Sequence, residues 1–329
     1  MTTAWPVAAA SGIGSLPGTD PREAVRTVLG ELPDLPFLPE LPARGPHADL
    51  TGRACALLAD LHVDLQPSGW RITPRPSRDG TRARDLLARD LDALEGTEAR
   101  PPFLKLQCAG PWTLAATVEL SRGDRLLADP GAVEDLAASL AQGLAAHLAD
   151  VARRLPGTTL VLQLDEPALP GVLSAQIPTA SGFGRLRAPD RLVALDRLRT
   201  VLQVAEQTVV HCCAPRPPFA LLADAGAGGV AVDAALLTSR DHDDLGAALE
   251  NDVRLLLGLV PSTDAALDLE ALAAPAKQLW RRLGFEPDRL PGLVVVTPSC
   301  GLAGASPAYA RQALQACAEI ARRLGEEPE

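Results

Sequence analysis

The chain has 329 residues, 22% of them charged, and a net charge of −10 at pH 7. A chain this acidic is repelled by phosphate backbones and anionic lipid, which argues against nucleic acid and membranes as partners. It has no apolar run long enough to cross a bilayer, and its first residues lack the basic and apolar regions of a signal peptide, so we expect a cytoplasmic protein. The length suits one barrel domain covering residues 1–329.

Eight apolar runs alternate along the chain with segments of helical spacing. The runs predict strands at 7–15, 36–42, 102–110, 158–166, 208–214, 229–234, 252–262 and 293–302. The helical segments are predicted at 21–32, 54–65, 82–94, 132–155, 189–206, 218–225, 241–249, 265–283 and 307–324. Eight strand–helix pairs are the count of a (β/α)8 TIM barrel, an α/β fold. A doubly wound sheet is disfavoured, because Gly12-Ile-Gly-Ser15 lacks the third glycine of a dinucleotide-binding turn.

Four potential metal ligands stand at the ends of three predicted strands. In Thr208-Val-Val-His-Cys-Cys-Ala214, His211 and Cys213 project to the same side of an extended backbone. Cys300 follows the last apolar run, and Asp233 ends the run at 229–234. The C-terminal ends of parallel barrel strands open on one face, so these side chains are expected to converge. One nitrogen, two sulfurs and one oxygen are donors that Zn2+ takes.

The cysteine count supports free thiols. Six cysteines in 329 residues are too sparse for a disulfide framework in a reducing compartment. We therefore interpret Cys213 and Cys300 as zinc thiolates, and Cys55, Cys212 and Cys317 as small buried side chains. Zinc held by two thiolates is electron-rich and activates water poorly, but it can bind an incoming thiol as a nucleophilic thiolate.

Asp165 and Glu166 are the candidate catalytic acids. Both stand at the exit of the predicted strand 158–166. In the functional interpretation Asp165 captures an ammonium group of the substrate. The alternative is that the pair caps a helix or binds an arginine.

Six short motifs, in chain order, resemble the C-terminal catalytic barrel of cobalamin-independent methionine synthase. They are Ile13-Gly-Ser-Leu-Pro17, Gly110-Pro-Trp-Thr113, Gln163-Leu-Asp-Glu-Pro-Ala-Leu169, His211-Cys-Cys213, the acid after Val230-Ala-Val232, and Pro298-Ser-Cys-Gly-Leu302. The resemblance implies a zinc-dependent transfer of a methyl group to the sulfur of homocysteine, with His211, Cys213 and Cys300 as ligands. It also implies that Ile13, Gly14, Ser15 and Asp165 bind the amino-acid substrate.

Three positions depart from the family's pattern. The family's fourth ligand is Glu, where this chain has Asp233, and its substrate-binding Glu falls near Pro42-Ala-Arg44, so Arg44 is the candidate substrate contact there. Thr117 replaces a tryptophan that serves folate. The methyl donor is therefore left open between a methyl-folate and a methyl-corrinoid protein. Two other functions also remain open, namely S-methylation of a different thiol and a non-catalytic zinc-binding barrel.

Overall fold

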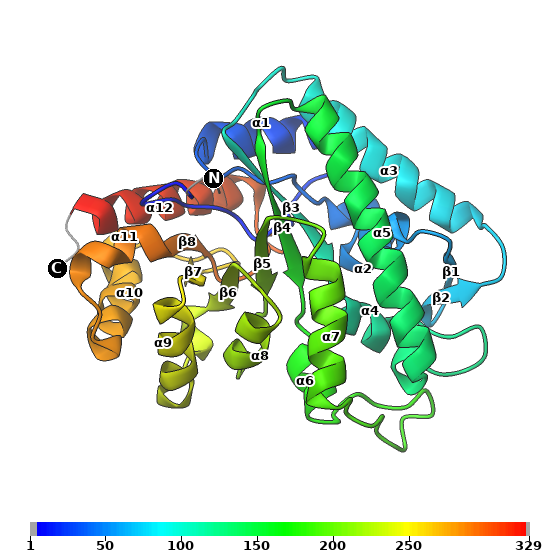
Figure 1. Cartoon of the computed structure of the whole chain (residues 1–329). Coiled ribbons are helices and arrows are strands. Elements are labelled where there is room, and N and C mark those ends of the chain that lie inside the picture. Colours follow the sequence, from blue (N-terminus) through cyan, green and yellow to red (C-terminus); the bar gives the residue numbers. More distant parts are fainter. Residues whose placement is uncertain (1–4, 327–329) are drawn as a thin grey trace.

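A curled sheet of six parallel strands forms the centre of the computed structural model, which describes residues 5–326 (Figure 1). The strands pair in chain order, and helices surround the sheet. Their bounds are β3 Phe103–Ala109, β4 Thr159–Asp165, β5 Gln207–His211, β6 Gly229–Asp233, β7 Arg254–Val260 and β8 Val294–Pro298. The last six predicted strands are thus confirmed.

The first two predicted strands are irregular extended segments, so the regular part of the predicted eight-stranded barrel has six strands. Segment 9–16 meets β8 through an isolated bridge between Ala10 and Val296, and segment 36–41 meets β3 through Phe37 and Lys105. A third bridge joins the two segments. Prolines at 36, 39 and 42 lack the N–H that a regular ladder needs. A Cβ on Gly12 would lie 2.2 Å from the Phe37 ring, so the close approach of the segments requires glycine there.

The outer helices follow the predicted order. They include α1 Pro21–Glu31, α3 Arg78–Glu95, α4 Pro111–Thr117, α5 Pro130–Arg154, α6 Leu169–Leu173, α7 Arg191–Leu202, α8 Phe219–Asp224, α9 His242–Glu250, α10 Leu269–Leu283, α11 Leu290–Leu293 and α12 Pro307–Glu326. Aspartates cap α1, α5 and α10, where each carboxylate accepts from the first free backbone N–H groups. No helix among the described residues is long and apolar enough to cross a membrane.

A β-hairpin replaces the second half of the helix predicted at 54–65. Helix α2, Leu50–Leu57, ends early, and β1 His62–Gln66 pairs antiparallel with β2 Gly69–Thr73. The Pro67-Ser68-Gly69 turn and the alternating apolar residues around it, Val63, Leu65, Trp70 and Ile72, indicate a hairpin. Leu57, Leu58 and Leu61 alone gave the misleading helical spacing.

Side chains inside the sheet form an apolar layer beneath a polar one. Phe103 and Val161 belong to a buried apolar cluster near the strand starts. Because strand side chains alternate, Lys105 and Gln107 follow Phe103 on the same face of β3, and Gln163 and Asp165 follow Val161 on β4. All four are buried. The polar groups therefore gather toward the C-terminal ends of the strands, where a site in such a fold is expected.

Candidate active site

Three of the four predicted metal ligands meet at the C-terminal ends of β5 and β8. The ligand atoms of His211, Cys213 and Cys300 all lie within 4.8 Å of one another. His211 ends β5, Cys213 follows two residues later, and Cys300 follows β8. These soft nitrogen and sulfur donors match zinc, and the group fits a three-ligand site.

Asp165 fixes the orientation of the His211 ring. Nδ1 of His211 lies 2.8 Å from Oδ1 of Asp165, and both side chains are buried. The same Oδ1 accepts a hydrogen bond from Nε2 of Gln163 at 2.7 Å. The other ring nitrogen, Nε2 of His211, is buried without a hydrogen-bond partner among residues 5–326. A buried, unpartnered imidazole nitrogen beside two sulfurs is what a metal ligand requires.

Contacts within the cluster shift the pKa values of its members in opposite directions. Burial lowers the pKa of His211, but interactions with Asp165 and Cys300 outweigh it and raise the pKa to about 9. The contact with Cys213, together with His211, lowers the pKa of Cys300 to about 4. The same sulfur–sulfur contact raises the pKa of Cys213. One thiolate is therefore already favoured at neutral pH, and thiolates are the form that binds metal.

Asp233 lies outside this group of three. It ends β6, and its carboxylate accepts a hydrogen bond from the Ala235 N–H at 2.9 Å, which caps the short helical turn Ala234–Leu236. The described geometry therefore joins three protein donors, and ligation by Asp233 stays a prediction.

A cavity of about 300 Å³ opens beside the cluster. Its lining brings together both halves of the chain: Ile13, Gly14, Ser15, Glu40, Pro42, Asp49, Leu50, Asp165, Pro167, His211, Cys213, Cys300 and Gly301. The volume is at the lower end of the range for small-molecule sites, about 300–1,000 Å³. The predicted substrate residues Ile13 to Ser15 and Asp165 thus share one cavity with the thiols.

Two buried side chains form hydrogen bonds with the backbone of the Ile13–Ser15 segment. Nζ of Lys105 and Nε2 of Gln163 each donate to the Ile13 carbonyl at 2.9 Å. Lys105 is fully buried, and burial lowers its pKa to about 8 although Asp165 and Glu40 oppose the shift. The segment therefore has a fixed position relative to the acids that surround it.

Glu40 is the functional residue that the sequence analysis missed. It lines the cavity with only 4% of its surface exposed, and its backbone bridges Ser15. Burial raises its pKa to about 7, while the charge of Arg53 opposes that shift. The available signal was a carboxylate within the apolar, proline-rich segment Pro36-Phe-Leu-Pro-Glu-Leu-Pro42. Burying a charge is costly unless it is paired, so a charged residue in such a segment indicates a functional role.

Arg44 and Glu166 face away from the cavity. Both terminal nitrogens of Arg44 bind Asp90 of α3, at 2.7 and 2.8 Å. The Glu166 carboxylate accepts from the backbone N–H groups of Trp112 and Thr113, at 2.9 and 2.7 Å, and from the Thr113 hydroxyl at 2.8 Å. Neither residue lines the cavity. The geometry gives Arg44 an ion-pair role and gives Glu166 the capping role that was the alternative interpretation of the acid pair.

A second cavity of about 330 Å³ adjoins the first at Asp49, which lines both. The β1–β2 hairpin supplies Trp70, and the end of α4 supplies Thr117. Trp70 is 3% exposed, and its indole Nε1 has no hydrogen-bond partner within the described part of the chain. The Trp70 side chain therefore forms part of the wall of this cavity, while its indole N–H is enclosed by protein atoms.

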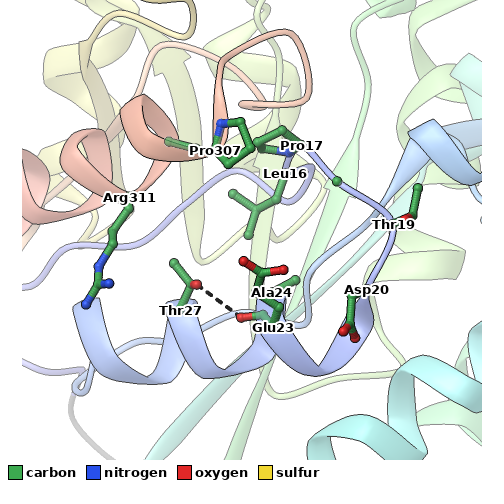
Figure 2. A pocket seen from close by; sticks show the side chains of 11 residues that line it. Leu16, Pro17, Thr19, Asp20, Glu23, Ala24, Thr27, Pro307 and Arg311 are labelled. Atoms are coloured by element: carbon green, nitrogen blue, oxygen red, sulfur yellow. Dashed lines mark hydrogen bonds between the residues drawn. The ribbon is translucent and has the colours of Figure 1, made fainter.

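A smaller hollow of about 150 Å³ lies between the starts of α1 and α12 (Figure 2). In Figure 2 Asp20 and Arg311 stand at opposite ends of it. None of the predicted ligands or substrate-binding residues lines it. Its volume is below the usual range of ligand sites, so we assign it no function.

The fold and the site define an α/β protein whose parallel strands carry a zinc-type cluster of one imidazole and two thiols beside an acidic cavity. The chain belongs to the cobalamin-independent synthase family, since the model of that family's catalytic domain matches residues 7–323. This match confirms the resemblance that the motifs indicated. No curated protein matches the chain.

Solved structures share the fold at low sequence identity. A B12-independent methionine synthase from Shewanella sp., in complex with selenomethionine, is 12% identical with a TM-score of 0.64, covering 98% of this chain and 99% of that one. A putative vitamin-B12 independent methionine synthase from Listeria monocytogenes is 13% identical, with the same TM-score and coverage. A methyltransferase from Methanosarcina mazei is 16% identical with a TM-score of 0.55, covering 97% and 93%.

Proposed function

We propose that the chain is a zinc-dependent methyltransferase that moves a methyl group to the sulfur of homocysteine. The observation that carries the proposal is the convergence of His211, Cys213 and Cys300 on a cavity that three carboxylates also line, two of them buried. Membership of the cobalamin-independent synthase family supports methionine-synthase-type chemistry. When bound at the three donors, zinc supplies a Lewis acid that keeps a substrate thiol deprotonated and nucleophilic.

The carboxylates of Glu40 and Asp165 are suited to an ammonium group. Both line the cavity and are at least 95% buried, where a charge is stabilised only by a partner of opposite sign. Lys105 and Arg53 are neighbouring cations, but neither forms a hydrogen bond with the Glu40 carboxylate, which can therefore accept from a substrate ammonium group. Lys105 and Gln163 fix the Ile13–Ser15 segment, which lines the same cavity. This segment would contact the part of the homocysteine substrate beyond its ammonium group.

The second cavity is the place we assign to the methyl donor. Asp49 lines both cavities, so a donor bound in the second would lie next to the site that contains the thiols. The aromatic side chain of Trp70 in its wall suits a heteroaromatic ring, as in a methyl-folate. The methyl-corrinoid alternative gains no support from the comparisons, because the family is described as cobalamin-independent.

The proposal is tested by assaying the zinc-loaded protein for methionine formation from homocysteine with methyl-tetrahydrofolate or methylcobalamin as donor. We expect transfer from the folate and its loss in Glu40→Gln. Transfer only to other thiols would favour the alternative S-methyltransferase. A protein that binds zinc but transfers no methyl group to any thiol would be the non-catalytic barrel, and the proposal would be wrong.

A further inference from the structure

A buried chain of alternating charges leads from α3 to the active-site cavity. Arg44 binds Asp90 at 2.7 and 2.8 Å, and Nη1 of Arg53 also binds Asp90. Nε of Arg53 lies 3.4 Å from Oε1 of Glu40, which lines the cavity. The side chains of all four residues are at most 10% exposed. Burial at this level makes each charge dependent on its neighbours in the chain.

Asp90 is the branch point of these contacts. Its Oδ1 accepts from Arg44, and its Oδ2 accepts from both Arg44 and Arg53. Two cations on one carboxylate leave an excess of one positive charge, which Glu40 balances at the other end. Arg44 therefore neutralises Asp90, and this leaves Arg53 with charge to share between Asp90 and Glu40.

The geometry of Arg53 divides its interactions unequally. Its guanidinium is a rigid plane, so the direction of Nη1 toward Asp90 sets the direction of Nε toward Glu40. The Nε and Oε1 atoms are close but do not form a hydrogen bond, and neither atom has another hydrogen-bond partner among residues 5–326. Glu40 thus has a cation near enough to stabilise its charge, without a hydrogen bond that ties the carboxylate to Arg53.

We propose that Asp90 is a positioning residue for substrate binding: by holding Arg53, it keeps the Glu40 carboxylate available to the ammonium group of the amino-acid substrate. The inference rests on the proposed function, which assigns that role to Glu40. Without Asp90, the Arg53 guanidinium would turn to Glu40 and form the direct ion pair that it now lacks. Arg53 would then compete with the ammonium group for the same oxygens.

The experiment compares Asp90→Asn with Asp92→Asn in the zinc-loaded protein. Asp92 is on the same helix and also binds an arginine, Arg154 at 2.9 Å, but its side chain is 66% exposed. The readouts are kcat and KM for homocysteine and for 4-mercaptobutyrate, which has the thiol and carboxylate but no ammonium group. We expect Asp90→Asn to raise KM for homocysteine about tenfold, as when one charged hydrogen bond weakens, with little change in kcat or in KM for the analogue.

Three results would overturn the inference. The first is an unchanged KM for homocysteine in Asp90→Asn. The second is an equal rise in KM for homocysteine and for 4-mercaptobutyrate in that variant. The third is the same rise in KM for homocysteine in Asp92→Asn. Should Asp90→Asn not fold, Asp90→Glu retains the charge and displaces it by one methylene. Its ratio of homocysteine to analogue kcat/KM must fall below that of the wild type, and an unchanged ratio overturns the inference. Failure of the proposed function is distinct, because the wild type would then not methylate homocysteine at all.

Discussion

Nδ1 of His211 and Oδ1 of Asp165 lie 2.8 Å apart in the buried interior of the site. The contact holds the imidazole ring so that its second nitrogen is left for a metal. Asp165 also lines the cavity, so one carboxylate links the three candidate metal ligands to the proposed amino-acid site. Substitution of Asp165 should therefore weaken both zinc binding and substrate binding. Substitution of a residue that has only one of these roles should weaken only one of them.

Asp165→Asn should weaken zinc binding by about 10- to 100-fold, the usual effect of removing a carboxylate that orients a ligating histidine. Competition with a chelator of known affinity measures the change. Asp241→Asn is the control, because Asp241 is also a buried aspartate but accepts hydrogen bonds from Thr238 outside the cluster, so its substitution should leave zinc affinity close to that of the wild type. Equal losses of zinc affinity in the two variants would show that the contact with His211 is not the cause.

The affinity for methionine should rise with pH through about 7. Burial raises the pKa of Glu40 to about 7, and only the ionised carboxylate attracts the ammonium group. At one pH unit below this pKa about one tenth of the protein has Glu40 ionised, so binding at pH 6 should be roughly tenfold weaker than at pH 8. Calorimetric titration of the zinc-loaded protein measures it. Glu40→Gln should bind weakly with no such dependence, and a dependence that persists in this variant would assign it to another group.

Glu166→Gln should destabilise the fold without removing zinc. The carboxylate accepts three hydrogen bonds from the start of α4, and an amide can accept only through its one oxygen. We expect a loss of about 2–4 kcal/mol in the free energy of unfolding, from weakened charge-assisted bonds. Denaturant unfolding and metal analysis give the two quantities. Normal stability with abolished methyl transfer would restore Glu166 to the catalytic role predicted from sequence.

Trp70→Leu should raise KM for the methyl donor several-fold and leave KM for homocysteine unchanged. The substitution removes the indole ring from the wall of the second cavity, where a heteroaromatic donor would pack against it. An aromatic contact of about 1 kcal/mol corresponds to a several-fold change. Trp280→Leu is the matched control, because the Trp280 ring packs against Phe285 and lines neither cavity. Indistinguishable kinetics in the two variants would exclude the second cavity as the donor site.

The regular strands and the metal cluster were predictable because their signals are local. A β-branched run such as Thr208 to Val210 identifies a buried strand, and the parallel topology then brings His211 and Cys300 together from positions 89 residues apart. The hairpin at 62–73 was missed because three leucines at helical spacing outweighed a proline–serine–glycine turn. Spacing alone cannot distinguish a helix end from a strand when both bury leucine.

The roles of Arg44 and Glu40 depend on tertiary contacts that spacing does not encode. The sequence places Arg44 near the expected substrate segment, but the partner that binds it, Asp90, is 46 positions away on α3. Glu40 is only four positions before Arg44, yet Glu40 lines the cavity and Arg44 does not. A register difference of four residues in this segment would exchange the two side chains. Such a choice follows from packing of the whole chain.

The central claim is tested most directly by metal analysis of the wild type, Cys300→Ser and Cys212→Ser after purification and dialysis. Cys212 is the matched control, because its thiol is adjacent to Cys213 but buried outside the three-ligand group. We predict one zinc ion per chain in the wild type and in Cys212→Ser, and loss of both zinc and methyl transfer in Cys300→Ser. Stoichiometric zinc with full activity in Cys300→Ser, or no zinc in the wild type, would contradict the account.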